Sequence, residues 1–172
     1  MRNVDNSIIV WYNMHDLENH MKGINVMCIS SHPKIGDIYL MDFSGSGSEQ
    51  RGWRPGLVFQ NNTGNAYSPN IIALPLTSAV KKTTQPTHVL LHAEDTGLLK
   101  DSVVLCENPE RMSKNKMGSY ITTVSDSYMQ EIASASLLAS SAISFIRPEN
   151  LLPLWEKASS LNGFSRGGAQ VV

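Results

Sequence analysis

Six short apolar runs separated by turn-forming clusters constrain the fold of this chain more than any other feature. The runs are rich in aliphatic and β-branched residues and cover 35–43, 56–60, 70–76, 87–93, 102–107 and 118–124. The clusters between them contain Gly, Pro, Asn, Asp and Ser, as in SGSGSEQRG, NNTGNAYSP and KKTTQP. Because no helical period lies between these runs, the pattern predicts a mainly β (α+β) fold in which an antiparallel sheet curls into a small barrel.

One long helix is expected after the strands, from Ser125 or Ser127 to Phe145. Ser127 followed by Gln130 fits a capping box, and apolar residues then recur at helical spacing until Arg147-Pro148 ends the pattern.

These elements divide the chain into three segments. We expect an N-terminal extension over 1–34 with one short helix over 16–21, a barrel domain over 35–146, and a loosely packed tail over 147–172. The tail carries apolar side chains that we expect to dock onto the barrel: Leu151, Leu152, Leu154 and Trp155.

The charge balance excludes a general electrostatic attraction to nucleic acid. Fourteen basic and 15 acidic side chains leave a net charge of −1, so a nucleic-acid-binding protein of this composition needs a local basic patch. Seven of the 14 basic residues fall in three predicted loops or rims, and if these cluster they form such a patch. The alternative to such a patch is that these basic side chains are separate, solvated loop residues. The seven are Arg51, Arg54, Lys81, Lys82, Arg111, Lys114 and Lys116.

Several other site classes are not supported. His88 and His92 are four apart on a predicted strand, which separates the imidazoles by about 13 Å, so no metal site is predicted. The GxG step at 45–47 lacks the third glycine and the following helix of a dinucleotide turn, and no GxSxG elbow is present.

The cysteines and the hydropathy pattern indicate where such a chain acts. Cys28 and Cys106 form no CxxC pair, so each is expected to be a buried or half-buried thiol in a reducing compartment. Neither a secretory signal nor a bilayer-spanning run is recognised, which predicts a soluble, cytoplasmic protein without membrane contact.

The segment from Ser44 to Arg54 combines three glycines and two further serines with Glu49, Gln50 and Arg51. This composition is found in loops that bind an anion or a polar ligand, but by itself it favours a solvated hairpin loop.

Several blocks in order, GDIYLMDF, SGSGSEQRGWRPGLVFQN, GNAYSPNIIALPLTS, QPTHVLL and GLLKDSVVLCE, resemble the MazF/PemK family of toxin–antitoxin ribonucleases over about 36–146. The resemblance implies a half-open antiparallel barrel of the Src-homology-3-like, plasmid-maintenance-toxin type with a long C-terminal helix. It also implies a homodimer, a cognate antitoxin as partner, and cleavage of single-stranded RNA without a metal or other cofactor.

The family's functional residues match positions of this chain. The resemblance implies Arg54 as catalytic arginine and Thr77 as catalytic threonine, with Glu49 a possible base for the ribose 2′-OH. The remaining matched or neighbouring polar residues are expected to bind the substrate: Ser48, Gln50, Arg51, Ser78, Lys81, Lys82, Asn108 and Arg111.

One departure from the family pattern follows the fifth strand, where the family commonly has a glutamine, an aliphatic residue and an arginine. Here Glu110 stands at the arginine position and the cation comes one place later, at Arg111. A carboxylate near the RNA path would repel phosphate, and Pro109 could redirect the loop so that Arg111 substitutes. The departure motivates two alternatives: a non-catalytic member that binds gyrase, as CcdB toxins do, or another protein, and an RNA-binding barrel without cleavage.

Overall fold

The computed structural model describes residues 32–44, 51–79 and 85–163. The chain divides into two units, 1–32 and 33–172, and all that is described below belongs to the second. The expected helix over 16–21 and Cys28 lie outside the described residues.

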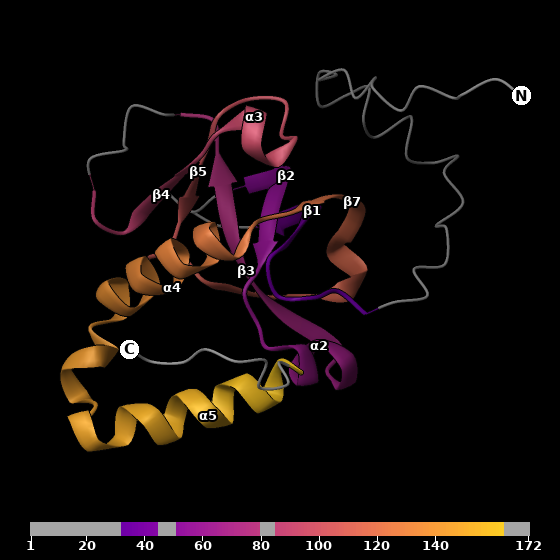
Figure 1. Ribbon diagram of the computed structural model, residues 1–172. Coiled ribbons are helices and arrows are strands. Elements are labelled where there is room, and N and C mark those ends of the chain that lie inside the picture. The colour runs from indigo at the N-terminus through magenta and orange to yellow at the C-terminus, as the bar shows by residue number, and fades with distance from the viewer. Residues whose placement is uncertain (1–31, 45–50, 80–84, 164–172) are drawn as a thin grey trace, which may run out of the picture. The chain divides into compact units, whose positions relative to one another are not determined.

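Seven strands form the antiparallel sheet that the apolar runs predict (Figure 1). The order is β4-β5-β3-β2-β1-β7, and β6 also pairs with β3. The first half of β3 pairs with β6 and its end pairs with β5, so both strands lie along one side of β3. The strands are β1 (Asp37–Ser44), β2 (Arg51–Val58), β3 (Asn70–Thr77), β4 (His88–Leu91), β5 (Ser102–Leu105), β6 (Glu110–Ser113) and β7 (Met117–Thr123).

Three predicted turn segments contain structure that the sequence pattern did not reveal. They hold α2 (Asn62–Tyr67), α3 (Ala93–Thr96) and β6. Strand β2 also begins at Arg51 and not at residue 56, so the loop prediction is wrong for 51–54. Its first half pairs with β1, with Phe43 opposite Gly52 and Leu40 opposite Pro55. Pairing with a formed strand therefore overrides the low strand propensity of glycine and proline.

The expected long helix is α4 (Asp126–Ser140); it begins at one of the two expected starts, and its predicted end needs correction. Ser125, not Ser127, is the N-cap, and its Oγ accepts a hydrogen bond from the Tyr128 N–H. The helix ends five residues before Phe145 because Ser141 is left-handed, with φ 53°. A 3₁₀ turn, η3 (Ala142–Phe145), follows.

The tail contains a second helix that was not expected. After the 3₁₀ turn η4 (Pro148–Asn150), α5 (Leu151–Leu161) begins. Its four N-terminal apolar residues do not dock as predicted and are exposed, Leu152 by 65% and Trp155 by 60%. The end of the helix is tied to α2 instead: the Asn62 N–H donates to Asn162 Oδ1 at 3.1 Å, and Asn62 Nδ2 donates to the Asn162 carbonyl at 3.1 Å.

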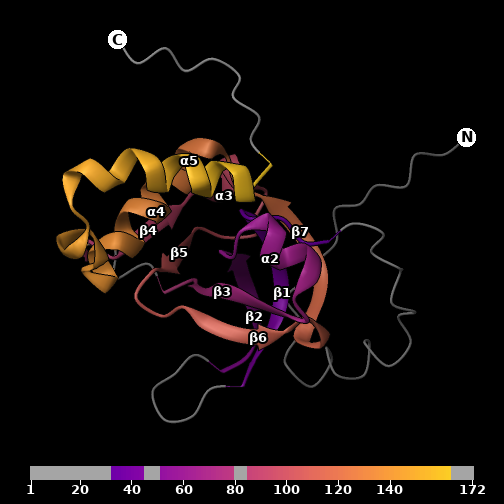
Figure 2. The same cartoon turned by 90° about the horizontal axis from the view of Figure 1, so that it is seen from below.

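The sheet has a separate core on each face. The main core joins strand residues such as Ile38, Leu57 and Leu74 to Ile132 and Ala135 of α4. The second group, which we call the small core, consists of Tyr39, Met41, Phe43, Val58, Ile71, Ala73 and Met112. Because side chains alternate along a strand, α4 covers one face of the sheet, while the small core marks the other. Figure 2 shows β6 beside β3, where Met112 completes the small core.

Within the described ranges, no helix combines the length and apolar character needed to span a bilayer.

Candidate functional site

Arg54 and Thr77 lie on one face of two neighbouring strands. The register of β2 and β3 pairs Val58 with Ala73 and Gly56 with Pro75. This pairing ends at Gly56 and Pro75; Arg54 and Thr77 lie two residues beyond that last pair, and alternation along each strand places both on its face. The two side chains that the sequence selected therefore lie on one face, just past the end of the β2–β3 pairing.

The face they share is that of the small core. Arg54 is opposite Met41 on β1, a small-core residue. Gly56, the next residue of β2 on this face, is packed over by two side chains: a Cβ there would lie 2.7 Å from Met41 Sδ and 2.8 Å from Phe43 Cζ. These side chains leave Gly56 no space for a larger residue, and they give the site an apolar floor beside Arg54.

Arg54 is half-buried, and this position changes its electrostatics. Burial lowers the pKa of the guanidinium, and the negative charge of Glu110 acts in the opposite direction. A partly desolvated cation attracts a phosphate more strongly than one in bulk water. The planar fork of an arginine also matches two phosphate oxygens.

Thr77 ends β3 with its hydroxyl oriented by the backbone. Its Oγ1 accepts a hydrogen bond from the Ala79 N–H at 3.2 Å, which leaves the hydroxyl proton to donate to an anion. Ser78 follows in an exposed bend.

Five expected site residues lie outside the described residues: Ser48, Glu49, Gln50, Lys81 and Lys82. Their attachment points are nevertheless informative. Ser44 pairs with Arg51 at the end of the β1–β2 ladder, next to Arg54. Segment 80–84 follows two residues after Thr77. Both segments therefore start from the end of the sheet that carries Arg54 and Thr77.

The remaining predicted residues lie on or near β6. Asn108 is exposed in the turn after β5, where its N–H donates to the Leu105 carbonyl at 3.2 Å. Glu110 pairs with Ala73 and Arg111 with Ile72, so the two charges project to opposite faces. Glu110 lies on the face of Arg54, and Arg111 is exposed on the other. Sequence reasoning had noted Glu110 only as a departure, because its face depends on the β3–β6 register.

Two lysines of the predicted basic patch lie in the turn that follows β6. Lys114 Nζ donates to the backbone carbonyl of Asn65 in α2 at 2.5 Å, so this hydrogen bond occupies its amino group. Lys116 closes the 3₁₀ turn η2 (Lys114–Lys116) before β7.

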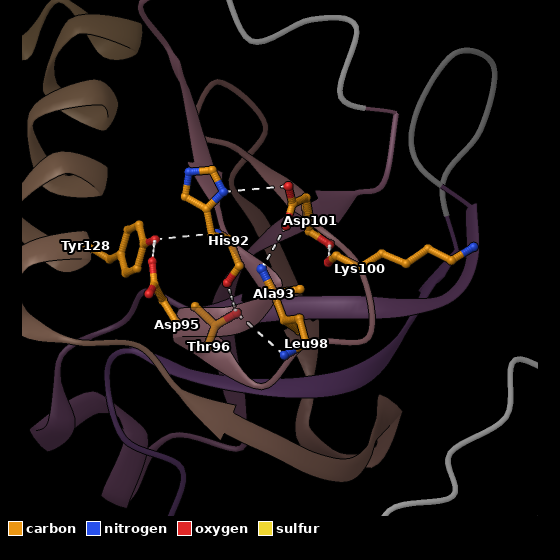
Figure 3. Close-up of polar contacts among 9 residues, drawn as sticks. His92, Ala93, Asp95, Thr96, Leu98, Lys100, Asp101 and Tyr128 are labelled. Carbon is orange, nitrogen blue, oxygen red and sulfur yellow. Dashed lines mark hydrogen bonds and ion pairs between the residues drawn. The ribbon is translucent and has the colours of Figure 1, made fainter.

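The two histidines pair with different carboxylates. His88 Nε2 lies 2.8 Å from Glu107 Oε1, and His92 Nδ1 lies 3.6 Å from Asp101 Oδ2. Figure 3 shows the second pair beside a contact between α3 and α4, in which the Tyr128 hydroxyl donates to Asp95 at 2.8 Å. In the part of the chain that the structure describes, no three His, Cys, Asp or Glu side chains gather as a metal site would require. We interpret the contacts of His92 with Asp101 and of Tyr128 with Asp95 as structural, because the second of them joins α3 to α4.

A sequence profile described as "PemK-like, MazF-like toxin of type II toxin-antitoxin system" matches residues 34–138, more than half of the chain. The chain belongs to this family. Among curated relatives of this MazF-like toxin, Endoribonuclease MazF of Staphylococcus saprophyticus is 43% identical over 101 residues, which cover 58% of this chain and 84% of the relative.

Solved structures of MazF-like toxins have the same fold. A mycobacterial endoribonuclease in complex with its cognate antitoxin is 28% identical, with a TM-score of 0.54 over 67% of this chain and 99% of that chain. MazF from Deinococcus radiodurans has a TM-score of 0.56 at 23% identity, over 63% and 96% of the two chains. The predicted family and the predicted half-open barrel with a helix are thereby confirmed. Helix α5 lies beyond the residues that the family profile matches.

Proposed function

We propose that this chain is the toxin of a type II toxin–antitoxin system and cleaves single-stranded RNA without a metal ion, with Arg54 and Thr77 contacting the scissile phosphate. The observation that supports the proposal is that both residues lie on one face of β2 and β3, two positions beyond the last pair of that ladder, Gly56 with Pro75. Family membership supports the same activity, since a MazF relative at 43% identity is named an endoribonuclease.

RNA carries its own nucleophile, so the enzyme needs only to position it and to stabilise charge. The 2′-oxygen attacks the adjacent phosphorus, the bond from phosphorus to the 5′-oxygen breaks, and the products are a 2′,3′-cyclic phosphate and a 5′-OH end. The 2′-OH proton passes to a base, for which we propose Glu49, and the leaving 5′-oxygen takes up a proton. DNA lacks the 2′-OH and should bind without reacting.

Arg54 and Thr77 both stabilise the transition state, each through a different interaction. The Arg54 guanidinium neutralises the charge that builds up on the phosphorane oxygens, and the Thr77 hydroxyl donates to one of them. Because an arginine stays a cation at neutral pH, charge stabilisation is its main role in this scheme. Substrate binding extends to polar residues of the segments that start from the same end of the sheet: Ser48, Gln50, Arg51, Ser78, Lys81, Lys82 and, from the β5–β6 turn and β6, Asn108 and Arg111.

The partners follow from the same site. A growth-arresting nuclease must be neutralised, and an acidic, partly disordered antitoxin segment lying over the basic end of the sheet would compete directly with RNA. The mycobacterial relative solved with its cognate antitoxin supports such a partner. We propose that the toxin acts as a homodimer in the cytoplasm, where its RNA substrate is located.

The test is purified protein incubated with a long single-stranded RNA in EDTA, with the new 5′-OH ends mapped by sequencing. Arg54→Ala should slow cleavage about 100-fold or more, and Thr77→Val about 10- to 100-fold. Arg147→Ala removes an exposed arginine outside the family match and serves as the control, with unchanged cleavage. Absence of discrete cleavage by the wild type, or wild-type rates in Arg54→Ala, would show that the proposal is wrong.

A protein-directed toxin is the second candidate, because a carboxylate, Glu110, lies on the face that RNA would contact. It predicts growth arrest with gyrase trapped on DNA and RNA left intact.

A further inference from the structure

Strand β4 forms one edge of the sheet, beside helix α4. The strand order places β4 beyond β5, and no described strand pairs with its other side. Figure 1 shows β4 as the outermost strand, next to α4. The backbone N–H and C=O groups along such an edge can form hydrogen bonds with a strand from another chain. This edge can therefore accept a further strand where its outward groups border open space.

The hydrogen-bond pattern fixes which backbone groups of β4 point outward. The Cys106 N–H donates to the Thr87 carbonyl at 3.1 Å, in the register that β4 and β5 share. Bonded and non-bonded pairs alternate along an antiparallel ladder, so Leu90, three positions after Thr87, directs its N–H and C=O away from β5. Two residues further, the His92 N–H donates to the Tyr128 hydroxyl of α4 at 3.4 Å, so this side of the strand faces α4 (Figure 3).

A groove lies between this edge and α4. It consists of two adjoining hollows, of about 490 and 710 Å³, each lined by residues of both β4 and α4. On the β4 side, His88 and Val89 border both hollows and Leu90 borders the larger one, while Ser127 and Glu131 of α4 border both. Side chains of a strand alternate between its two faces. Three consecutive lining residues therefore mean that the backbone edge itself borders the groove.

The groove carries negative charge. Among the described residues, no lysine or arginine lines either hollow, whereas the exposed carboxylates Asp95 and Glu131 line the larger one. The two lining histidines each lie beside a further carboxylate, Glu107 or Asp101. RNA and an acidic antitoxin segment would be repelled here, and a segment that carries lysine or arginine would be attracted.

We propose that the β4 edge and α4 form a docking groove for an extended, lysine- or arginine-bearing segment of a partner protein, which adds a strand to β4 and places its cations beside Glu131. Strand addition takes its affinity from backbone hydrogen bonds and its selectivity from side-chain contacts. The groove is separate from the proposed RNA site. Leu90 pairs with Val103 and Val103 with Thr77, so the added strand lies three strand spacings, about 14 Å, from Thr77.

The probe is the capped, fluorescently labelled pentapeptide Ac-Val-Lys-Val-Lys-Val-NH₂, whose Kd for the full chain is measured by fluorescence anisotropy. The matched peptide with glutamate in place of lysine should bind about 10-fold more weakly or worse, because the groove repels it. Two N-methylated forms test strand pairing, one methylated on its valine amides and the other on its lysine amides. Only alternate N–H groups of a strand face its neighbour, so the two forms should differ in Kd by about 10-fold or more.

Two substitutions test the groove from the protein side. Leu90→Pro removes the outward N–H and none of the bonds to β5, at a position where an edge strand tolerates proline. It should weaken binding of the lysine peptide about 10-fold or more, and Glu131→Gln about 2- to 5-fold. The control, Glu149→Gln, removes an exposed carboxylate of η4 and should leave Kd unchanged. If Leu90→Pro does not fold, hydrogen exchange decides: saturating peptide should slow exchange of the wild-type Leu90 amide about 10-fold or more.

Several results would overturn the inference. They are a lysine peptide that does not bind at about 1 mM, equal Kd values for the two methylated forms, wild-type affinity in folded Leu90→Pro or in Glu131→Gln, and an unchanged Leu90 exchange rate. Tighter binding of the glutamate peptide would overturn it by assigning the groove to an acidic segment, and a dimer that Leu90→Pro dissociates would do so by assigning the edge to a second copy. These measurements involve no RNA, so failure of the proposed RNA cleavage leaves the inference standing.

Discussion

Burial disfavours charge at two residues of this protein, with different consequences. Arg54 is half-buried, and the pKa lowering that burial causes is opposed by Glu110. Cys106 is 2% exposed in the main core, and burial raises its thiol pKa to about 11, with the neighbouring Ser136 hydroxyl lowering it and the charge of Glu107 raising it further. The charge of Glu110 thus favours the cationic form of Arg54, while Cys106 remains a neutral thiol near neutral pH.

The Cys106 thiol should be unreactive in the folded protein. At pH 8 a pKa of about 11 leaves about one thiol in a thousand ionised, and the thiolate is the nucleophile. In a Cys28→Ser variant, iodoacetamide should label native Cys106 about 100-fold more slowly than the denatured chain. The native rate should also rise with pH up to pH 10 without a plateau. Mass spectrometry measures the extent of labelling. Fast labelling of native Cys106 at pH 8 would contradict this expectation.

Sequence motifs identified two residues of the proposed site but did not show that a third residue lies on the same face. Arg54 and Thr77 could be selected from the sequence because each stands in a distinctive block, RGWRP and PLTS. The position of Glu110 on their face could not be selected, because it follows from how β6 pairs with β3. Shifting that register by one residue would put Arg111 on the site face and Glu110 on the other.

At the scale of elements, the local sequence pattern was sufficient to predict a strand or a helix where its run of residues was long or strongly apolar. The strands β1, β3, β5 and β7 and helix α4 were predicted within a few residues of their observed bounds. Strand β6 and helices α2 and α3 have four to six residues each, too few to show a period. Helix α2 is instead fixed by its Asn61 cap, whose side chain accepts from the Gly64 N–H at 2.8 Å.

The two candidate caps of α4 can be distinguished by stability. Ser125 Oγ accepts from the Tyr128 N–H, whereas the Ser127 hydroxyl contacts only Ser125 Oγ among the described polar groups, at 2.8 Å. Ser125→Ala should lower the free energy of unfolding by about 1 kcal/mol, and Ser127→Ala by less than about 0.5 kcal/mol. Urea unfolding followed by circular dichroism measures both. A larger loss of stability from Ser127→Ala than from Ser125→Ala would indicate that Ser127, the residue of the predicted capping box, is the N-cap.

At the scale of the whole molecule, attraction to RNA must be local because the net charge is −1. The family could be predicted from the order of its motifs, while the basic patch that the charge count calls for stays a prediction. Helix α5 could not be placed from sequence, because its contact with α2 is made by polar groups of Asn62, Thr63 and Asn162. The apolar residues at its other end had suggested a different contact.

This charge distribution predicts a shallow salt dependence of RNA binding. Each phosphate neutralised on a single strand contributes about −0.7 to the slope of log K against log salt concentration. The five proposed cationic contacts, Arg51, Arg54, Lys81, Lys82 and Arg111, therefore limit the slope to about −3.5. The Kd of the RNA with a 2′-deoxy cleavage site, measured from 50 to 400 mM KCl, gives the slope directly. Lys81→Gln and Lys82→Gln should each reduce its magnitude by about 0.7, while Lys157→Gln, exposed on α5, should leave it unchanged. A slope steeper than about −5 would require cations that this interface does not include, and a slope near zero would exclude phosphate contacts altogether.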